Sequence, residues 1–338
     1  NEVRNFIKPN SHKTKYLRKR DVFNFLVNLS FKVTGKGYHP LFKGLFFNPF
    51  INKNKEFQFF NTILIGRNPF EVTFETTLPR LGNAPKWLYK LAIKQLVKPN
   101  CKKIYALSQC AYNLQKEYLQ NEWPKYYEKI LAKMEVKLPY QEPIISDYSE
   151  KKLPPDQIIF TIVGADFFRK GGMEVLIAFD QLIPSYPQLQ LNIVSTLNYG
   201  DYATNTTVED QKAALQIIQK YPKNIHHFHS LPNSKVIELY KNSHVGLLPT
   251  WADSFGYSVL EAQAAGCPCI TTNIRALPEI NDGMIGWIID ISHKQYNHSG
   301  KNYLSNEIKK TIIEIINIPN AVIKLKASIL INMFINQR

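Results

Sequence analysis

The sequence contains few cysteines, and no cysteine pair has the spacing of a zinc site. Four cysteines occur among 338 residues, Cys101, Cys110, Cys267 and Cys269, and none forms a C-x-x-C pair. This usage argues against a structural zinc site and against the disulfide framework of a small secreted protein. We therefore expect reduced thiols and a cytoplasmic location.

Long apolar runs and nucleic-acid signatures are also missing. No apolar run in the sequence approaches the roughly 18 residues that a membrane-spanning helix needs. Basic residues are not interleaved with aromatic ones in the pattern of a known nucleic-acid module, so we expect no nucleic-acid partner. The length favours two domains of about 150 to 200 residues each.

Positive charge is concentrated in the first half of the chain. Residues 1–150 hold 25 Lys and Arg against 12 Asp and Glu, whereas residues 151–338 hold 17 against 15. A basic surface attracts anionic lipid or polyanionic glycan, and an ordinary solvated surface explains the same numbers. The first interpretation predicts peripheral attachment at the cytoplasmic face of a membrane.

The second half alternates between short apolar runs and amphipathic segments, which predicts a doubly wound parallel sheet. Strands are expected over 158–163, 189–195, 225–230, 244–250 and 268–273, and helices over 171–186, 208–221, 234–243, 256–266 and 320–334. Ligands of such a sheet bind beyond the carboxyl ends of its strands.

The first half is less regular but has the same character. Strands are expected over 60–66, 70–76 and 102–108, with a helix over 84–98. We predict a first domain over 1–145, a linker over 146–156, a second domain over 157–318 and a final helix over 319–338.

The segment "PTWADSFGYSVLEAQAAGCPCITTN" combines a strand end, a glycine-containing loop and a helix. The helix start near Gly256 and Tyr257, after Ser254 and Phe255, offers free N–H groups suited to a diphosphate. Asp253 and Glu261 lie eight residues apart and can accept hydrogen bonds from sugar hydroxyls. A helix cap and a solvated helical Glu are the simpler alternative.

The segment "IVGADFFRKGGMEVLIAF" places a strand end at Gly164 and two cations at the following helix start. Arg169 and Lys170 are suited to a phosphate group, Lys as a point charge and Arg as a fork. A basic surface pair is the alternative for this segment taken alone.

Together, the two segments resemble the nucleotide-sugar domain of retaining GT-B glycosyltransferases of the family four type. The resemblance is strong over about residues 158–290 and covers the first half by architecture only. It implies two Rossmann-like domains that face a central cleft, the first on the acceptor side and the second binding the donor. The final helix is expected to pack back on the first domain.

The resemblance also implies roles for particular residues. Asp253 would contact the donor sugar and Glu261 the ribose, while Arg169 and Lys170 would hold the diphosphate. Gly164, Ser254, Phe255, Gly256 and Tyr257 complete the expected donor site. Asp253 stands where Glu is commoner, Ala165 where many members have Arg, and Ser195, Thr196 and Ser230 where glycines are usual, which puts the base and the sugar in doubt.

Two candidate sites fall in the first half. Glu75 lies near the place of a family His that faces the donor across the cleft, and Arg80 follows it; we expect both on the acceptor side, Glu75 in a catalytic role. A polar residue at a strand end is the alternative for Glu75. The stretch "TGKGYHP", with Gly35, Gly37 and His39, is the candidate for the family's glycine-rich loop.

The expected function is therefore retaining hexosyl transfer from a UDP- or GDP-linked sugar to a glycan or lipid-linked acceptor, in surface polysaccharide or glycolipid synthesis. No Asp-x-Asp motif is present, so we expect no metal requirement and no cofactor. A sugar-nucleotide epimerase of the same fold and a non-catalytic nucleotide- or glycan-binding protein are the alternatives.

Overall fold

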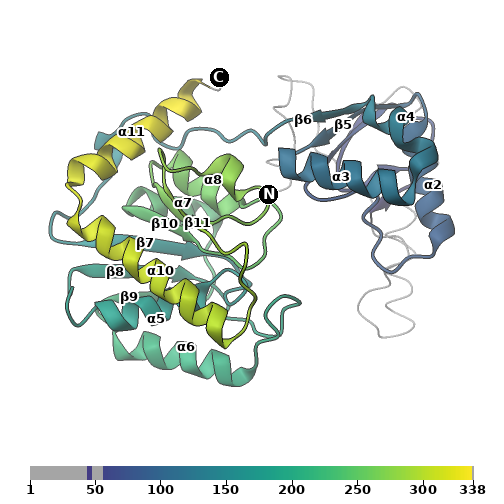
Figure 1. The fold of residues 1–338 in the computed structure, drawn as a ribbon. Helices are drawn as coiled ribbons and strands as arrows, with labels where there is room; N and C mark the ends of the chain where they lie inside the picture. Colours follow the sequence, from purple (N-terminus) through teal and green to yellow (C-terminus); the bar gives the residue numbers. More distant parts are fainter. Residues whose placement is uncertain (1–43, 48–55, 337–338) are drawn as a thin grey trace. The chain divides into compact units, whose positions relative to one another are not determined.

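The computed structural model describes residues 44–47 and 56–336, which form parts of two compact units. The units comprise Asn1–Tyr140 and Gln141–Arg338 and are called unit 1 and unit 2 (Figure 1). The glycine-rich candidate with Gly35, Gly37 and His39 lies outside the described residues.

Unit 2 contains a six-stranded parallel sheet in the order β12-β11-β10-β7-β8-β9. Its strands are β7 (Ile158–Val163), β8 (Leu189–Val194), β9 (Ile225–Phe228), β10 (Val245–Leu248), β11 (Cys269–Thr272) and β12 (Trp287–Ile289). Its helices are η4 (Tyr148–Glu150), α5 (Gly172–Leu182), α6 (Val208–Lys220), α7 (Asn233–Lys241), α8 (Tyr257–Ala264), α9 (Leu277–Ile280), α10 (His298–Asn317) and α11 (Asn320–Asn336). The strand order is that of a Rossmann-like sheet, in which the chain winds first one way and then the other.

Burial explains why these segments form strands and helices. Every residue of β8, β10 and β11 is buried, as expected for central strands covered on both faces. Helices α5, α6 and α10 pack together, and α7, α8 and α11 form a second group (Figure 1). Helix α8 ends before Gly266, whose φ of +68° suits the left-handed residue that follows many helices.

The predicted strands and helices of unit 2 agree with the observed ones to within a few residues. Helices α9 and α10 and strand β12 were not predicted from the sequence. The predicted linker, 146–156, lies inside unit 2, where the Lys151 ammonium donates to the carbonyls of Tyr240 and Ala265. Helix α11 also belongs to unit 2 and packs against α8 and η4; its expected contact with the first domain stays a prediction.

Unit 1 contains a four-stranded parallel sheet in the order β2-β4-β5-β6 and a separate parallel pair, β1 and β3. The strands are β1 (Leu45–Phe46), β2 (Phe57–Phe60), β3 (Ile63–Leu64), β4 (Phe70–Phe74), β5 (Cys101–Ala106) and β6 (Met134–Val136). The helices are α2 (Lys86–Val97), α3 (Gln109–Glu122), η3 (Pro124–Tyr126) and α4 (Tyr127–Leu131).

The strand predicted over 60–66 is wrong in one respect. The chain leaves the sheet at Asn61, whose φ is +50°, so β2 ends at Phe60 and β3 joins a different strand. Asparagine tolerates this left-handed conformation better than other non-glycine residues. Helix α2 lies between β4 and β5, as predicted.

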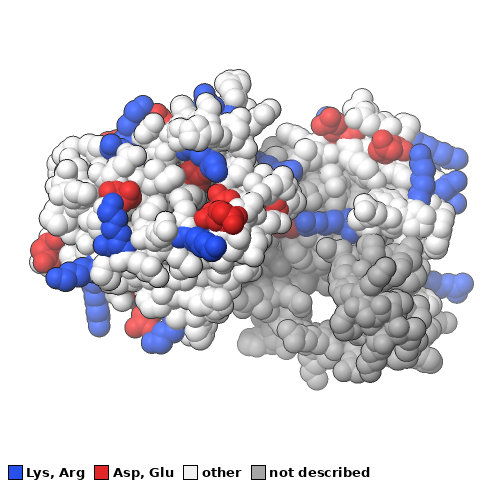
Figure 2. Space-filling model, turned by 90° about the horizontal axis from the view of Figure 1, so that it is seen from below, with Lys and Arg blue, Asp and Glu red and all other residues white. Residues whose placement is uncertain are grey.

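No single helix among the described residues is long and apolar enough to cross a membrane, and α10 with α11 passes that test only as a pair bent by 105°. Charged side chains of both signs are visible on both units, and on unit 1 Lys and Arg side chains gather along one edge (Figure 2).

Candidate active site

The candidate site lies where the winding of the unit 2 sheet changes direction. Strands β7 and β10 are neighbours at the centre of the sheet, and the chain moves from β7 toward β8 but from β10 toward β11. Two loops follow their carboxyl ends, residues 164–171 after β7 and 249–256 after β10. We call them the β7 loop and the β10 loop; such a switch point is where ligands of open α/β sheets bind.

Main-chain hydrogen bonds join the two loops. The main-chain carbonyl of Arg169 accepts from the main-chain N–H of Trp251 and from the Thr250 hydroxyl, each at 2.9 Å. Gly171 has a φ of +75°, and a side chain there would collide with the carbonyl oxygen of Pro249. The first glycine of the Arg-Lys-Gly-Gly quartet therefore lets the two loops approach closely, and a side chain at the second, Gly172, would collide with the ring of Phe167.

Lys170 and Asp253 form the ion pair at the centre of the site. Lys170 Nζ lies 3.0 Å from Asp253 Oδ2, with side chains only 15% and 14% exposed. Burial alone would raise the pKa of Asp253, but the Lys170 charge and hydrogen bond, the Phe255 N–H and Arg169 hold it below its ordinary value. The stem of Lys170 lies over Gly164, where a side chain would displace it.

Arg169 is held on both sides of its guanidinium group. Nη2 pairs with the Asp166 carboxylate and Nη1 donates to the carbonyl of Ala252 in the β10 loop. The aromatic ring of Tyr202, which is 79% exposed, lies 5.8 Å from the guanidinium carbon. Arg169 therefore links the β7 loop to the β10 loop. Each of its two terminal nitrogens has a second N–H that can donate to a ligand.

The start of α8 supplies main-chain donors next to this pair. Gly256 precedes the helix with a φ of +96°, in the left-handed region, and a side chain there would collide with Leu277. The Phe255 ring is buried, so its expected contribution to the donor site is limited to its main chain, whose N–H donates to Asp253 Oδ1 at 3.3 Å. Ser254 and Tyr257 are half-buried at the same helix start.

Glu261 is buried in the second turn of α8, with 8% of its surface exposed. Its Oε1 accepts from the side-chain amide of Asn233 at 3.1 Å. Asn233 is the first residue of α7, and no local pattern in the sequence marks it because its partner lies 28 residues away. The pair brings the start of α7 to the carboxylate that the family resemblance assigns to the ribose.

A second contact that was not predicted from the sequence fixes the β10 loop to helix α5. Trp251 donates its indole N–H to Glu174 Oε1 at 3.1 Å, and its ring meets Tyr296 edge to face at 5.5 Å. Glu174, on α5, is fully buried. Burial raises the pKa of Glu174 to about 7, although the Trp251 hydrogen bond and Lys301 oppose the shift.

Two of the unusual residues of the β8 region contact the β7 loop. The hydroxyls of Ser195 and Thr196 donate to the carbonyl of Ala165 at 3.2 and 3.4 Å. These serine and threonine side chains therefore fill space that glycines would leave open, and they tie the end of β8 to the β7 loop. Ser230 is exposed, just beyond β9.

The unit 1 candidates lie together at the carboxyl end of β4. Glu75 Oε1 accepts from Arg80 Nη1 at 2.6 Å and from the side-chain amide of Asn61 at 3.4 Å. The side chain of Glu75 is 13% exposed and that of Arg80 is 45% exposed. The structure thus brings Glu75 and Arg80 together and adds Asn61; their role toward an acceptor stays a prediction.

No group of three or more His, Cys, Asp or Glu side chains is placed to hold a metal ion in the part of the chain that the structure describes. No disulfide joins the cysteines of the described residues, and three of the four cysteines are buried. The expectation that the protein needs no metal stays a prediction.

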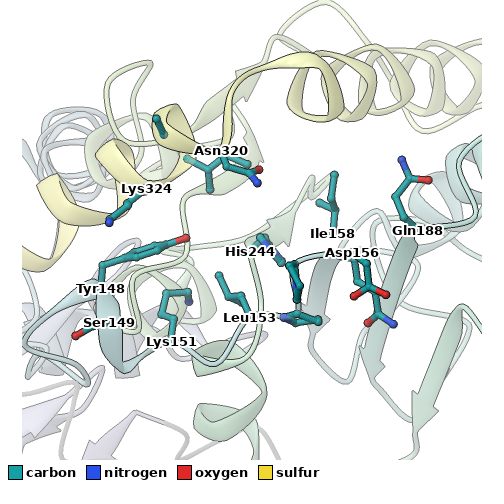
Figure 3. A pocket seen from close by; sticks show the side chains of 15 residues that line it. Tyr148, Ser149, Lys151, Leu153, Asp156, Ile158, Gln188, His244, Asn320 and Lys324 are labelled. Carbon is teal, nitrogen blue, oxygen red and sulfur yellow. The ribbon is translucent and has the colours of Figure 1, made fainter.

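A cavity of about 660 Å³ lies at the opposite end of the unit 2 sheet (Figure 3). Its lining includes Ile158, the first residue of β7, and His244, which directly precedes β10. Tyr148, Asn320 and Lys324 form another wall. Because the cavity lies at the amino ends of the strands, it is separate from the β7 and β10 loops.

Comparison with known proteins connects this site with one family. The family model Glycosyl transferases group 1 matches residues 145–314, a range that contains every donor-site residue named above. A D-inositol 3-phosphate glycosyltransferase from Thermobifida fusca is 25% identical over 146 residues, which are 41% of this chain and 32% of the relative. A 41.2 kDa protein of the cps region of Klebsiella pneumoniae is 28% identical over 101 residues, 30% of this chain and 28% of that protein. The chain thus matches about a third of the length of these curated relatives.

Solved structures share the fold at low sequence identity. A glycosyltransferase from Rickettsia africae has a TM-score of 0.55 at 19% identity, over 80% of this chain and 66% of that chain. An E. coli structure bound with UDP-2-fluoro glucose has a TM-score of 0.58 at 13% identity, over 86% and 71%. Anabaena HepE in complex with UDP has a TM-score of 0.51 at 13% identity, over 79% and 68%. The predicted α/β fold of the GT-B type is confirmed.

Proposed function

The chain belongs to the family Glycosyl transferases group 1, and from this premise we propose that it transfers a hexose-type sugar from a UDP- or GDP-linked donor to a glycan or lipid-linked acceptor. Retention at the anomeric carbon and independence of metal ions are parts of the proposal. So are a cytoplasmic location, peripheral attachment to an anionic membrane surface, and a role in surface polysaccharide or glycolipid synthesis.

The Lys170–Asp253 pair is the observation that carries this proposal. It places a cation and a carboxylate at the switch point of the unit 2 sheet, beside the start of α8. A diphosphate requires a positive group and N–H donors, and a sugar requires an oriented hydrogen-bond acceptor. Both requirements are met within one small region, by two loops that hydrogen bonds hold together.

The donor occupies this region in a defined order. Glu261 accepts hydrogen bonds from the ribose, and the α8 N–H groups near Gly256 and Tyr257 contact the diphosphate. Lys170 contacts the same phosphates. Its ammonium has three N–H donors and uses one of them for Asp253, so the others can donate to phosphate oxygens. Asp253, held ionised by Lys170, accepts from a hydroxyl of the sugar.

Catalysis then rests on electrostatic stabilisation of the leaving group. As the glycosidic bond breaks, negative charge grows on the diphosphate, and Lys170, Arg169 and the start of α8 stabilise it where it develops. The site does this with groups that are already fixed by Asp166, Ala252 and Asp253, so little reorganisation is needed. The departing phosphate accepts the proton of the acceptor hydroxyl, and no separate strong base is required.

Glu75 and Arg80 serve the acceptor in this proposal. The Arg80 guanidinium orients the Glu75 carboxylate, and the carboxylate accepts a hydrogen bond from an acceptor hydroxyl. Asn61, in the bend after β2, donates its side-chain amide to the same carboxylate oxygen.

A panel of sugar nucleotides tests the proposal. UDP-linked sugars come first, because two structures of the same fold carry UDP or a UDP-sugar, and GDP-linked sugars follow. We expect thermal stabilisation by one donor class and slow release of nucleoside diphosphate, accelerated by the correct acceptor. An epimerase would convert the donor without any acceptor, and a non-catalytic binder would be stabilised without turnover. No stabilisation by any member of the panel would refute the proposal.

A further inference from the structure

Helix α2 of unit 1 buries one face and exposes another of unusual composition. Its buried residues are Leu88, Ala92, Ile93, Gln95 and Leu96. Its exposed face carries Lys86, Trp87, Lys90, Leu91 and Lys94, with Lys98 directly after the helix end. We call these six residues the α2 basic face.

Helical geometry gathers these six residues into one stripe. With 3.6 residues per turn, they fall within a sector of about 140° around the axis. The four lysines recur every fourth residue and form a row along the helix, and α2 contains no Asp or Glu. The row therefore carries an unbalanced positive charge on its own element.

The apolar members of the stripe are exposed to an unusual degree. Trp87 is 62% exposed and Leu91 is 37% exposed, and their spacing of four residues places them side by side. Trp side chains are enriched where an apolar surface meets water, as at a membrane interface. An exposed Trp–Leu pair beside lysines offers an apolar contact together with the positive charge that anionic lipid attracts.

Neighbouring elements leave the charge of α2 in place. Helices η3 and α4 pack against α2 and carry the exposed lysines Lys125 and Lys129, which the exposed Glu122 and Glu128 balance. Basic side chains are gathered along one edge of unit 1 (Figure 2). The excess positive charge therefore comes from the lysine row of α2 itself.

We propose that the α2 basic face docks unit 1 on an anionic lipid bilayer, with the four lysines at the phosphate level and Trp87 and Leu91 inserted among the upper acyl carbons. The occupant is a lipid surface rather than a nucleic acid, because a single exposed ring offers no series of stacking platforms for bases. The Trp–Leu pair would gain nothing from contact with a phosphate backbone.

This inference deepens the membrane part of the proposed function and is independent of donor chemistry. A lipid-linked acceptor lies at a bilayer surface, and docking through α2 would bring unit 1, with Glu75 and Arg80, to that surface. Each lysine near a negatively charged bilayer contributes about 1 kcal/mol, or about fivefold in binding. The proposal therefore predicts a large effect of a few substitutions.

Vesicle flotation of the full chain tests the proposal. Wild type is compared with a triple variant, Lys86→Gln, Lys90→Gln and Lys94→Gln, on vesicles of phosphatidylcholine with 30% phosphatidylglycerol. We expect the triple variant to bind about a hundredfold more weakly, on the basis of about fivefold per lysine. Wild-type binding should weaken as salt rises and vanish on vesicles of phosphatidylcholine alone.

A matched control separates the α2 basic face from net charge. Lys152→Gln, Lys212→Gln and Lys223→Gln remove the same charge from exposed positions of unit 2 and should leave binding within about twofold. Equal losses in the two triple variants would show that net charge alone drives binding and would overturn the proposal. Absence of vesicle binding by wild type would overturn it as well.

Two further measurements test insertion of the Trp87 ring into the bilayer and nucleic acid as an alternative partner. Trp87→Phe should abolish most of the fluorescence quenching that brominated lipids cause, and persistence of that quenching would contradict insertion of this ring. Binding of a single-stranded oligonucleotide, lost in the α2 triple variant without any vesicle binding, would identify nucleic acid as the partner instead. Stabilisation by UDP or GDP, measured on the same proteins, reports on the proposed catalytic function separately.

Discussion

Lys170 and Asp253 are separated by 83 residues in the sequence, yet their side chains meet at 3.0 Å across the switch point of the unit 2 sheet. The pair connects the β7 loop to the β10 loop at the point where a donor phosphate and a donor sugar would meet. Its two charges compensate each other before any ligand arrives, so the site is ordered and still has unused N–H donors on Lys170.

Removal of the Lys170 charge should lower sugar transfer strongly. We expect Lys170→Ala to reduce kcat/KM at least about a hundredfold, the scale of losing one preorganised electrostatic group. Lys220→Ala is the matched control, because Lys220 pairs with Asp180 on the surface of the same unit and is 58% exposed. Steady-state kinetics of both variants check this; equal, small effects would remove Lys170 from the site.

A loss of activity at low pH should not come from protonation of Asp253. Its pKa lies below its ordinary value despite burial, because Lys170 stabilises the ionised form. The contribution of ionised Asp253 to the stability of the folded protein is therefore complete above the unfolded pKa of about 3.9. It is lost only as pH falls through the lower pKa of the folded protein. Profiles of kcat/KM between pH 5 and 9 should show a similar loss at every pH for Asp253→Asn; a wild-type loss of activity near pH 6 that this variant lacks would contradict the assignment.

Glu174 should make stability depend on pH in the opposite sense. Its pKa rises from 4.5 to about 7 on folding, so the folded protein keeps a proton that the unfolded chain releases between these values. The free energy of unfolding should fall by up to about 3 kcal/mol as pH rises from 4.5 to 7 and then level off. Urea unfolding at pH 5 and 7.5 measures the difference.

Two variants isolate this effect of Glu174. Glu174→Gln keeps an acceptor for the Trp251 indole and should remove the difference between the two pH values. Glu209→Gln, at an exposed position of α6, should leave it unchanged. If Glu174→Gln preserves the full pH dependence, the buried carboxyl is not its source.

Asn233 should affect recognition of the ribose. Its amide donates to Glu261 Oε1 at 3.1 Å, so Asn233→Ala should weaken binding of a nucleoside diphosphate by about three- to tenfold, the scale of one ordinary net hydrogen bond. The loss on Asn233→Ala should be smaller for the 2′-deoxy nucleotide, which lacks one of the hydroxyls that Glu261 would accept from. Isothermal titration of both nucleotides compares them, and equal losses would place Asn233 outside the ribose site.

Arg80 should act on the acceptor and not on the donor. Arg80→Met removes the partner that orients Glu75, and we expect a higher KM for the acceptor, or a lower kcat, with nucleotide affinity within about twofold of wild type. Arg67→Met, at another exposed arginine of unit 1, serves as control. A loss of nucleotide affinity in Arg80→Met would contradict the division of roles between the units.

Local patterns in the sequence were sufficient to predict five of the six strands of the unit 2 sheet and both of its site loops. Strand and helix periodicity is strong there, and Gly266 with Pro268 marks the end of α8 clearly. Arg169, Lys170, Asp253 and Glu261 are detectable because each lies at a fixed place relative to a strand end or a helix start.

Long-range partners could not be predicted in this way. Trp251 meets Glu174 77 residues away, and Glu261 meets Asn233 on a helix whose start carries no distinctive motif. The strand predicted over 60–66 was wrong because the positive φ of Asn61 breaks an apolar run that has no glycine or proline at the break. In α2, amphipathic periodicity predicted the helix, but only the structure shows that Trp87 belongs to the exposed face.

The difference in affinity between a nucleoside diphosphate and its monophosphate, measured in wild type and in Lys170→Ala, tests the central claim most directly. For wild type we expect UDP, or GDP if that base is preferred, to bind at least about tenfold more tightly than the monophosphate, because charge-assisted contacts to the second phosphate are worth about 1.5 kcal/mol or more. Lys170→Ala should lose most of this difference and bind the monophosphate almost as wild type does. An unchanged difference in the variant, or no difference in wild type, would contradict the assignment of Lys170 and the two loops to the diphosphate.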